Sequence, residues 1–182
     1  MKLERCGIDG LYIVIPTVFR DPRGLFFESY NLDEFTRLGL NTVWRQDNLA
    51  VSSRNVLRGL HFQRGKGQAK LVSCVHGRIW DVAVDLRTDS SSFGQWHGLE
   101  LIAENNLMFY IPAGFAHGYV VLSDTAKVTY KCSTVYDPEL EDQIKWDDPE
   151  IGVEWPAADP IISERDQKAQ SFRLYQDSMA SR

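Results

Sequence analysis

The sequence predicts a mainly β protein folded as a sandwich or barrel. Its 182 residues form short runs of β-branched, aromatic and aliphatic residues, and Gly, Pro, Asn and Asp separate these runs. About ten short strands at this spacing are typical of sandwiches and barrels, whereas alternating strand and helix patterns would predict a parallel sheet. The length and the ordinary globular composition, with 43% hydrophobic residues, predict one domain over 1–182 that buries its own core.

Each expected strand combines β-forming residues with turn residues at its ends. The expected ranges are Leu11–Pro16, Gly24–Tyr30, Val43–Val51, Val56–Gln63, Lys70–Val75, Arg78–Leu86, Gly98–Leu101, Met108–Ile111, Tyr119–Leu122 and Lys127–Val135. Only two segments have helical signals. Asn31 is a suitable cap for a short helix over Leu32–Leu38 that ends at Gly39. Ser163 and Asp166 fit a capping box that opens a second helix near the C-terminus.

Two of these strands carry polar groups that need an explanation. In Arg78–Leu86, Asp81 and Asp85 share one face with apolar residues. Either a solvent-facing side or the polar lining of a barrel, where buried carboxylates need partners, explains that face. An unbroken strand from Val128 would also align Tyr130 and Tyr136, either as core aromatics or as two phenols that face a ligand.

The charge distribution argues against a general nucleic-acid binder. Twenty basic and 25 acidic residues give a net charge of −5, the opposite of what such proteins usually have. The stretch from Asn48 to Trp80 nevertheless contains no Asp or Glu. Its cations are Arg54, Arg58, Arg64, Lys66, Lys70 and Arg78. This basic band indicates either a local site for an anionic ligand or a solvated basic face.

The sequence also argues against a membrane or secreted protein. No apolar stretch approaches the roughly 20 residues of a membrane span, and the N-terminal residues lack a secretory pattern. Cys6, Cys74 and Cys132 are odd in number and widely spaced, so we expect neither a disulfide framework nor a structural zinc site. A reducing cytoplasm is the expected location.

Candidate catalytic groups concentrate in two segments. Arg58–Gln63 carries Arg58 and His61 within a strand pattern, and Lys70 opens the next strand. With a tyrosine as acid, these residues suit removal of a proton next to a carbonyl: the imidazole is the base, and a cation stabilises the enolate oxygen. This chemistry needs no redox cofactor.

A metal-dependent alternative follows from the turn at Pro112–His117. Its Pro-x-Gly-x-x-His pattern is similar to the second half of the cupin metal signature. The first half of that signature carries a His-x-His pair and a Glu, whereas this chain has His61, Phe62 and Gln63. With four histidines in the chain, a three-ligand site is hard to assemble, so we expect no metal.

An ordered set of motifs runs through nearly the whole chain. Its segments are Phe19–Glu28, Gln46–Asn48, Leu57–Gln63, Gln68–Val72, Asp81–Arg87, Ile111–Gly118, Tyr130–Cys132, Trp146–Pro149 and Ile162–Asp166. By these motifs the chain resembles the dTDP-4-dehydrorhamnose 3,5-epimerase family, metal-free cupins of deoxysugar biosynthesis. The resemblance implies a cupin-type jelly-roll β-barrel with a few short helices in the N- and C-terminal parts.

The resemblance also implies a role for individual residues. His61 would be the general base, Asp166 its partner, Tyr130 the acid and Lys70 the group that polarises the C4 oxygen. Further residues match sugar- or phosphate-contacting positions of the family. They are Gln46, Asn48, Arg58, His117 and Tyr136. His117 fits a buried, hydrogen-bonded core histidine equally well.

The N-terminal part is implied to act across a homodimer interface. Phe19, Arg23, Phe26 and Glu28 match residues with which family members hold the nucleotide of a partner subunit. The resemblance divides the chain into N-terminal strands and a helix shared across the dimer (1–45), a barrel core (46–136) and C-terminal strands with a helix (137–182).

The expected reaction inverts C3 and C5 of dTDP-4-dehydro-6-deoxy-D-glucose without a cofactor, giving dTDP-4-dehydro-L-rhamnose. Three alternatives stay open: a 3- or 5-only epimerase of a related sugar nucleotide, a non-catalytic cupin that binds sugar nucleotides, and a metal-dependent cupin enzyme.

Overall fold

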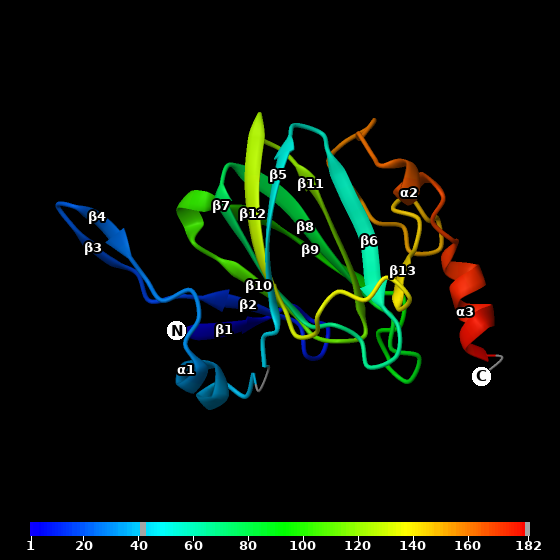
Figure 1. Cartoon of the computed structure of the whole chain (residues 1–182), viewed down its shortest axis with the longest axis horizontal. Coiled ribbons are helices and arrows are strands. Elements are labelled where there is room, and N and C mark those ends of the chain that lie inside the picture. Colours follow the sequence, from blue (N-terminus) through cyan, green and yellow to red (C-terminus); the bar gives the residue numbers. More distant parts are fainter. Residues whose placement is uncertain (41–42, 181–182) are drawn as a thin grey trace.

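Two facing antiparallel sheets form the jelly-roll barrel that the sequence predicts (Figure 1). The computed structural model describes residues 1–40 and 43–180. The six-stranded sheet has the order β1 (Lys2–Arg5), β2 (Tyr12–Ile15), β10 (Met108–Ile111), β7 (Lys70–His76), β12 (Thr125–Cys132), β5 (Gln46–Ser53). The five-stranded sheet has the order β13 (Glu141–Gln143), β6 (Leu57–Gln63), β11 (Phe115–Val121), β8 (Arg78–Asp85), β9 (Trp96–Ile102).

The remaining elements lie outside the two sheets. β3 (Phe19–Asp21) and β4 (Gly24–Phe26) form a separate hairpin that projects from the body of the molecule (Figure 1). The helices are α1 (Leu32–Arg37), the 3-10 turn η1 (Ala103–Asn105), α2 (Glu164–Gln167) and α3 (Phe172–Ala180). No helix among the described residues is both long and apolar enough to cross a membrane.

Side-chain caps start the two predicted helices. The Asn31 side chain accepts hydrogen bonds from the amides of Asp33 and Glu34, as expected of an N-cap. The Ser163 hydroxyl accepts from the amide of Asp166 at 3.1 Å and so starts α2. α3 follows as a separate helix and packs Phe172 against the outer face of the five-stranded sheet.

Two clusters of the hydrophobic core lie on the two sides of the five-stranded sheet, and a third joins Phe35 of α1 to Leu71 of the six-stranded sheet. Between the sheets, Ile79 of β8 packs with Phe109 and other buried residues. On the outer face, Val82 and Val84 of the same strand pack with Phe172. Both faces of β8 are buried, so Asp81 and Asp85 line the barrel interior and do not face solvent.

Asp85 has enough partners to remain charged although it is fully buried. Its carboxylate accepts hydrogen bonds from Arg87, Ser90 and Ser92. Burial raises the pKa of Asp85, but these hydrogen bonds outweigh it and lower the pKa to about 2. The network fixes the turn after β8.

Several predicted boundaries differ from the structure. The strand expected over Gly24–Tyr30 ends at Phe26, and the strand expected over Tyr119–Leu122 is β11, which begins at Phe115. β12 ends at Cys132 because its partner β5 begins opposite it, at Gln46. Three short strands were not predicted: β3 in the hairpin, and the edge strands β1 and β13, of which β13 consists of polar residues alone.

A register shift between β6 and β11 turns both Arg58 and His61 toward the interior. His117 lies opposite His61, and Tyr119 lies opposite Arg58, so three steps along β6 match two steps along β11. Without this bulge, strand alternation would put Arg58 and His61 on opposite faces. The two backbones nearly touch here: a Cβ on Gly118 would lie 2.8 Å from the carbonyl oxygen of Arg58.

Replacing Gly118 by Ala should therefore destabilise the fold by about 1–3 kcal/mol, because the added methyl group has no room against the β6 backbone. Gly152→Ala is the control, since its Cβ would meet nothing closer than 3.8 Å and only its positive φ of 64° opposes alanine. Urea unfolding measures both. A smaller loss for Gly118→Ala than for Gly152→Ala would contradict the close approach.

Candidate active site

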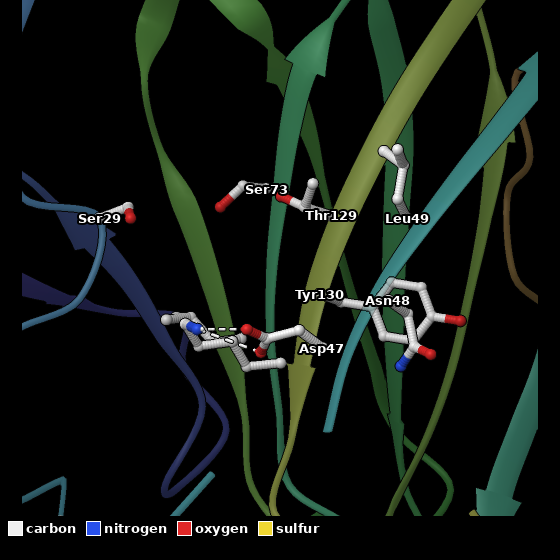
Figure 2. Close-up of a pocket in the computed structure, with 9 residues that line it drawn as sticks. Ser29, Asp47, Asn48, Leu49, Ser73, Thr129 and Tyr130 are labelled. Carbon is white, nitrogen blue, oxygen red and sulfur yellow. Dashed lines mark hydrogen bonds and ion pairs between the residues drawn. The ribbon is translucent and has the colours of Figure 1, made fainter. Parts of the chain in front are cut away.

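Polar side chains line the barrel interior from both sheets. In the six-stranded sheet, Tyr130 lies opposite Asn48 and Val72, and Cys132 lies opposite Gln46 and Lys70. Directly opposed residues of antiparallel strands share a face, so these polar groups line the same wall. Figure 2 shows Asn48 and Tyr130 side by side on neighbouring strands.

His61 and Asp166 form the shortest polar contact of the interior. His61 Nε2 lies 2.6 Å from the Asp166 carboxylate, and the Asp166 side chain is 4% exposed. The Asp166 amide meanwhile bonds the capping Ser163, so the residue takes part in a helix cap and also reaches the barrel. Both interpretations of Asp166 therefore hold together.

This contact fixes which nitrogen of His61 is free. Burial raises the pKa of Asp166, but the hydrogen bond to His61 and the other interactions outweigh it, and the pKa lies below its ordinary value. An ionised carboxylate only accepts hydrogen bonds, so Nε2 carries the proton. In the neutral imidazole, Nδ1 then keeps a free lone pair and is the basic atom.

Lys70 is a buried cation without a counter-ion within contact distance. No ion pair or hydrogen bond joins its ammonium to another side chain in the part of the chain that the structure describes, residues 1–40 and 43–180. Burial lowers the pKa of Lys70, although the nearby Cys132, Glu141 and Asp81 act in the opposite direction. A buried ammonium of this kind is stabilised when an anionic oxygen approaches it.

Tyr130 is an available proton donor. Burial is the main cause that raises its pKa, so the phenol keeps its proton at neutral pH. It stands on the six-stranded sheet, whereas His61 stands on the five-stranded sheet. An acid and a base therefore reach the interior from opposite walls.

His117 is buried and bonded within the protein. Its Nε2 lies 2.9 Å from Oδ1 of Asp81, which is fully buried. Burial is the main cause that lowers the pKa of His117. This geometry fits a core histidine that supports the wall next to His61, its partner in the register.

Gln46 and Asn48 form a hydrogen-bonded chain. Gln46 Oε1 accepts from the amide of Tyr136 at 2.7 Å, and its Nε2 donates to Asn48 Oδ1 at 2.9 Å. The Asn48 amide also donates to Cys132 Sγ at 3.5 Å. The expectation that Tyr136 continues the β12 strand is wrong, because β12 ends at Cys132 and Tyr136 lies in the loop beyond it, 49% exposed.

Four of the predicted site residues lie away from this interior. Phe19 and Phe26 are exposed on the projecting hairpin, and Arg23 bonds only Asp21 among the described residues. Glu28 follows the hairpin and accepts from Asn31. The barrel of one chain therefore does not bring the N-terminal group to the catalytic candidates.

Most of the basic band is a solvated face. Arg54, Arg64 and Arg78 pair with carboxylates near the surface. Lys70 of the band is buried in the interior, whereas Arg58 is itself exposed and its Nε donates to the buried Ser52 at 3.1 Å. The basic band is therefore a solvated face at Arg54, Arg64 and Arg78, and Lys70 is its candidate for an anion site.

Some site residues were not singled out from the sequence. They are Ser52, Tyr119, Cys132, Glu141, Gln143 and Arg165. On β13, Glu141 lies opposite Gln63 of β6, and Gln143 lies opposite His61. No local pattern indicates them, since β13 is three residues long. Over residues 1–40 and 43–180, no group of three His, Cys, Asp or Glu side chains is arranged to hold a metal ion.

The fold and the site together define a class of protein. A jelly-roll barrel that holds a basic imidazole nitrogen, a protonated phenol and a buried ammonium is suited to moving protons at carbon, the chemistry of many isomerases. The chain belongs to the dTDP-4-dehydrorhamnose 3,5-epimerase family, whose model matches residues 5–173. It is therefore an isomerase, and the resemblance inferred from the motifs is confirmed.

Similarity to individual relatives covers nearly the whole chain. A dTDP-4-dehydrorhamnose 3,5-epimerase of Salmonella typhimurium is 49% identical over 172 residues, which are 93% of this chain and 94% of the relative. The crystal structure of the Elizabethkingia anophelis enzyme of the same name has a TM-score of 0.91 at 53% identity and covers 96% of this chain and 97% of its own. A Legionella pneumophila 3,5-epimerase crystallised with dTDP-4-keto-L-rhamnose has a TM-score of 0.93 at 40% identity, with coverages of 98% and 96%.

The lowered pKa of Asp166 predicts a pH-dependent contribution to stability. An acid whose pKa is lower in the folded state stabilises the fold above its unfolded pKa, and this contribution is lost as pH falls through the folded value. We expect the wild type to have a larger unfolding free energy than Asp166→Asn. This difference should be largest at about pH 6 and should shrink below about pH 4.

Urea titrations at several pH values measure that difference. Because groups that do not contact Asp166 titrate alike in both proteins, the difference isolates this carboxylate together with its partner His61. A difference that stays constant between about pH 3 and 6 would mean that Asp166 does not ionise against His61.

Proposed function

We propose that the chain inverts C3 and C5 of dTDP-4-dehydro-6-deoxy-D-glucose, giving dTDP-4-dehydro-L-rhamnose, by proton transfer among its own side chains. The observation that carries this proposal is that His61 and Tyr130 stand on opposite sheets of the barrel. A sugar ring between them would lose a proton from one face and gain one on the other. Inversion of a carbon centre requires removal and return of the proton on opposite faces, which this arrangement provides.

His61 acts as the general base through Nδ1. The atom takes the proton from C5 and C3 in turn, since both carbons neighbour the C4 ketone. Asp166 holds the ring in the orientation that leaves Nδ1 free and stabilises the imidazolium that forms. The 2.6 Å contact supports this pairing.

Lys70 stabilises the enolate. A carbon next to a ketone is a much weaker acid than imidazolium, so the base needs help from a group that meets the charge on the C4 oxygen. The Lys70 ammonium is buried and has no carboxylate in contact within the described ranges. The enolate oxygen supplies the counter-charge that it lacks, which favours the transition state over the ground state.

Tyr130 returns the proton on the opposite face. Its phenol is protonated and partly buried next to Asn48. Tyr136 closes the sugar pocket from the loop after β12. We assign further contacts with the sugar or the diphosphate to Gln46, Asn48 and Arg58, whereas His117 supports the wall beside His61.

We also propose that the enzyme is a homodimer that shares its N-terminal hairpins. Phe19 and Phe26 are 61% and 66% exposed on a hairpin that projects from its own barrel. Aromatic rings at such exposure need a partner surface. With Arg23 and Glu28, they would hold the nucleotide in the site of the other subunit.

The outer face of the six-stranded sheet supports the same dimer. Leu49 and Val51 of β5 and Val75 of β7 are more than half exposed there. A hollow of about 340 Å³ beside them is lined by Leu49 and Thr129, among others. A second copy of the chain would bury this apolar surface.

Exchange of sugar hydrogens in heavy water tests the proposed reaction. The wild type should exchange both the C3 and the C5 hydrogen, and His61→Asn should reduce the rate about 10²- to 10⁴-fold because the base is lost. His76→Asn is the control, since the His76 side chain is exposed at the end of β7. Mass spectrometry and NMR of the sugar report the positions.

Exchange at one carbon only would indicate a single-site epimerase, and binding without exchange would indicate a non-catalytic cupin. Loss of exchange after dialysis against a chelator, with recovery on adding a divalent metal, would contradict proton transfer by side chains alone.

Mixing two inactive variants tests the shared site. Arg23→Ala chains and His61→Ala chains should each have little activity. In a hybrid dimer, one site has its own His61 and receives Arg23 from the other chain, so random mixing should restore about one quarter of wild-type activity. Heterodimers purified with two different tags that remain inactive would refute the exchange of hairpins.

A further inference from the structure

We propose that Arg165 is a positioning residue that holds both walls of the active site. Its guanidinium joins α2, which carries Asp166, to β13, and through Glu141 it also fixes Tyr136. This inference rests on the proposed function, because it assigns Arg165 to the catalysis by His61. Arg165 itself touches none of the reacting atoms.

Three contacts join Arg165 to β13. Its Nη1 lies 2.9 Å from Glu141 Oε2, and its Nε donates to Gln143 Oε1 at 2.9 Å. Gln143 Nε2 donates in return to the backbone oxygen of Arg165 at 2.7 Å. The Arg165 side chain therefore binds Glu141 and Gln143 of β13, and Gln143 also binds the Arg165 backbone.

These contacts close a ring around the catalytic base. Gln143 pairs with His61 in the register of β13 and β6. His61 bonds Asp166, and Asp166 follows Arg165 in the chain. α2 is only four residues long, too short to keep its own shape without such contacts. The orientation of Asp166 toward His61 therefore depends on how α2 is attached to β13.

Glu141 extends the effect to the opposite wall. Its carboxylate accepts a hydrogen bond from the Tyr136 hydroxyl, the main cause that raises the pKa of Tyr136. The charge of Glu141 also acts on Lys70 and Tyr130. Without the guanidinium, a carboxylate near Lys70 would compete with the enolate for the same ammonium.

The exposure of Arg165 separates this role from a structural one. Its side chain is 47% exposed, and ion pairs at such sites contribute little to stability. Removal of the guanidinium should therefore affect catalysis much more than unfolding. A residue that only stabilised the fold would show the reverse.

The first experiment compares Arg165→Met with Arg173→Met. Arg173 pairs with Asp177 on the exposed face of α3 at 3.5 Å, so it is a matched surface ion pair outside the site. Arg165→Met should lower kcat roughly 10- to 100-fold through misplacement of His61 and Asp166, with a thermal midpoint close to that of the control. A kcat within twofold of the wild type would overturn the proposal.

Two further variants separate the contacts. Arg165→Lys keeps a positive charge for Glu141 but cannot also donate to Gln143, so kcat should fall while KM stays near the wild-type value. Glu141→Gln weakens the hold on Tyr136, so KM should rise more than kcat falls. Arg165→Lys also tests the proposal if Arg165→Met does not fold. Equal effects on kcat and KM in both variants would contradict two separate contacts.

A measurement without substrate keeps this inference distinct from the proposed function. The short bond between His61 and Asp166 should give a strongly deshielded Nε2 proton in the NMR spectrum, identified by its loss in His61→Asn. The signal should shift or broaden in Arg165→Met and persist in Arg173→Met. An unchanged signal in Arg165→Met refutes positioning by Arg165, whether or not the wild type acts on the substrate. Absence of hydrogen exchange by the wild type refutes only the proposed reaction.

Discussion

The contact between His61 and Asp166 is the interaction on which the site depends. It joins a strand of the barrel to a four-residue helix more than a hundred positions later in the chain. Because the buried carboxylate stays ionised, it fixes the proton of the imidazole on Nε2 and leaves Nδ1 basic. The C-terminal segment is therefore part of the site and not an appendage to the barrel.

The barrel interior keeps opposite functions on opposite sheets. The five-stranded sheet carries His61, the proposed base, and the six-stranded sheet carries the phenol of Tyr130 and the ammonium of Lys70. Burying an ammonium without a partner is unfavourable for the empty protein. In the proposed reaction, the same arrangement favours the enolate, because its oxygen develops the negative charge that the ammonium lacks.

The parts of the fold that depend on local patterns could be predicted from the sequence. Alternation in β8 and the caps Asn31 and Ser163 depend on neighbouring residues, and the structure confirms them. The bulge in β6 could not be predicted, because it depends on how closely the β11 backbone approaches at Gly118. Family motifs indicated His61, Lys70 and Tyr130, whereas Glu141 and Arg165 act through contacts between distant segments that no local pattern reveals.

The protonation state of the His61 ring tests this account most directly. Nitrogen-15 NMR of protein labelled at histidine, with His61 assigned through His61→Asn, distinguishes a protonated ring nitrogen from a bare one. We expect a proton on Nε2, facing Asp166, and a bare Nδ1. A ring that carries its proton on Nδ1 would contradict the pairing with Asp166 and, with it, the identity of the basic atom.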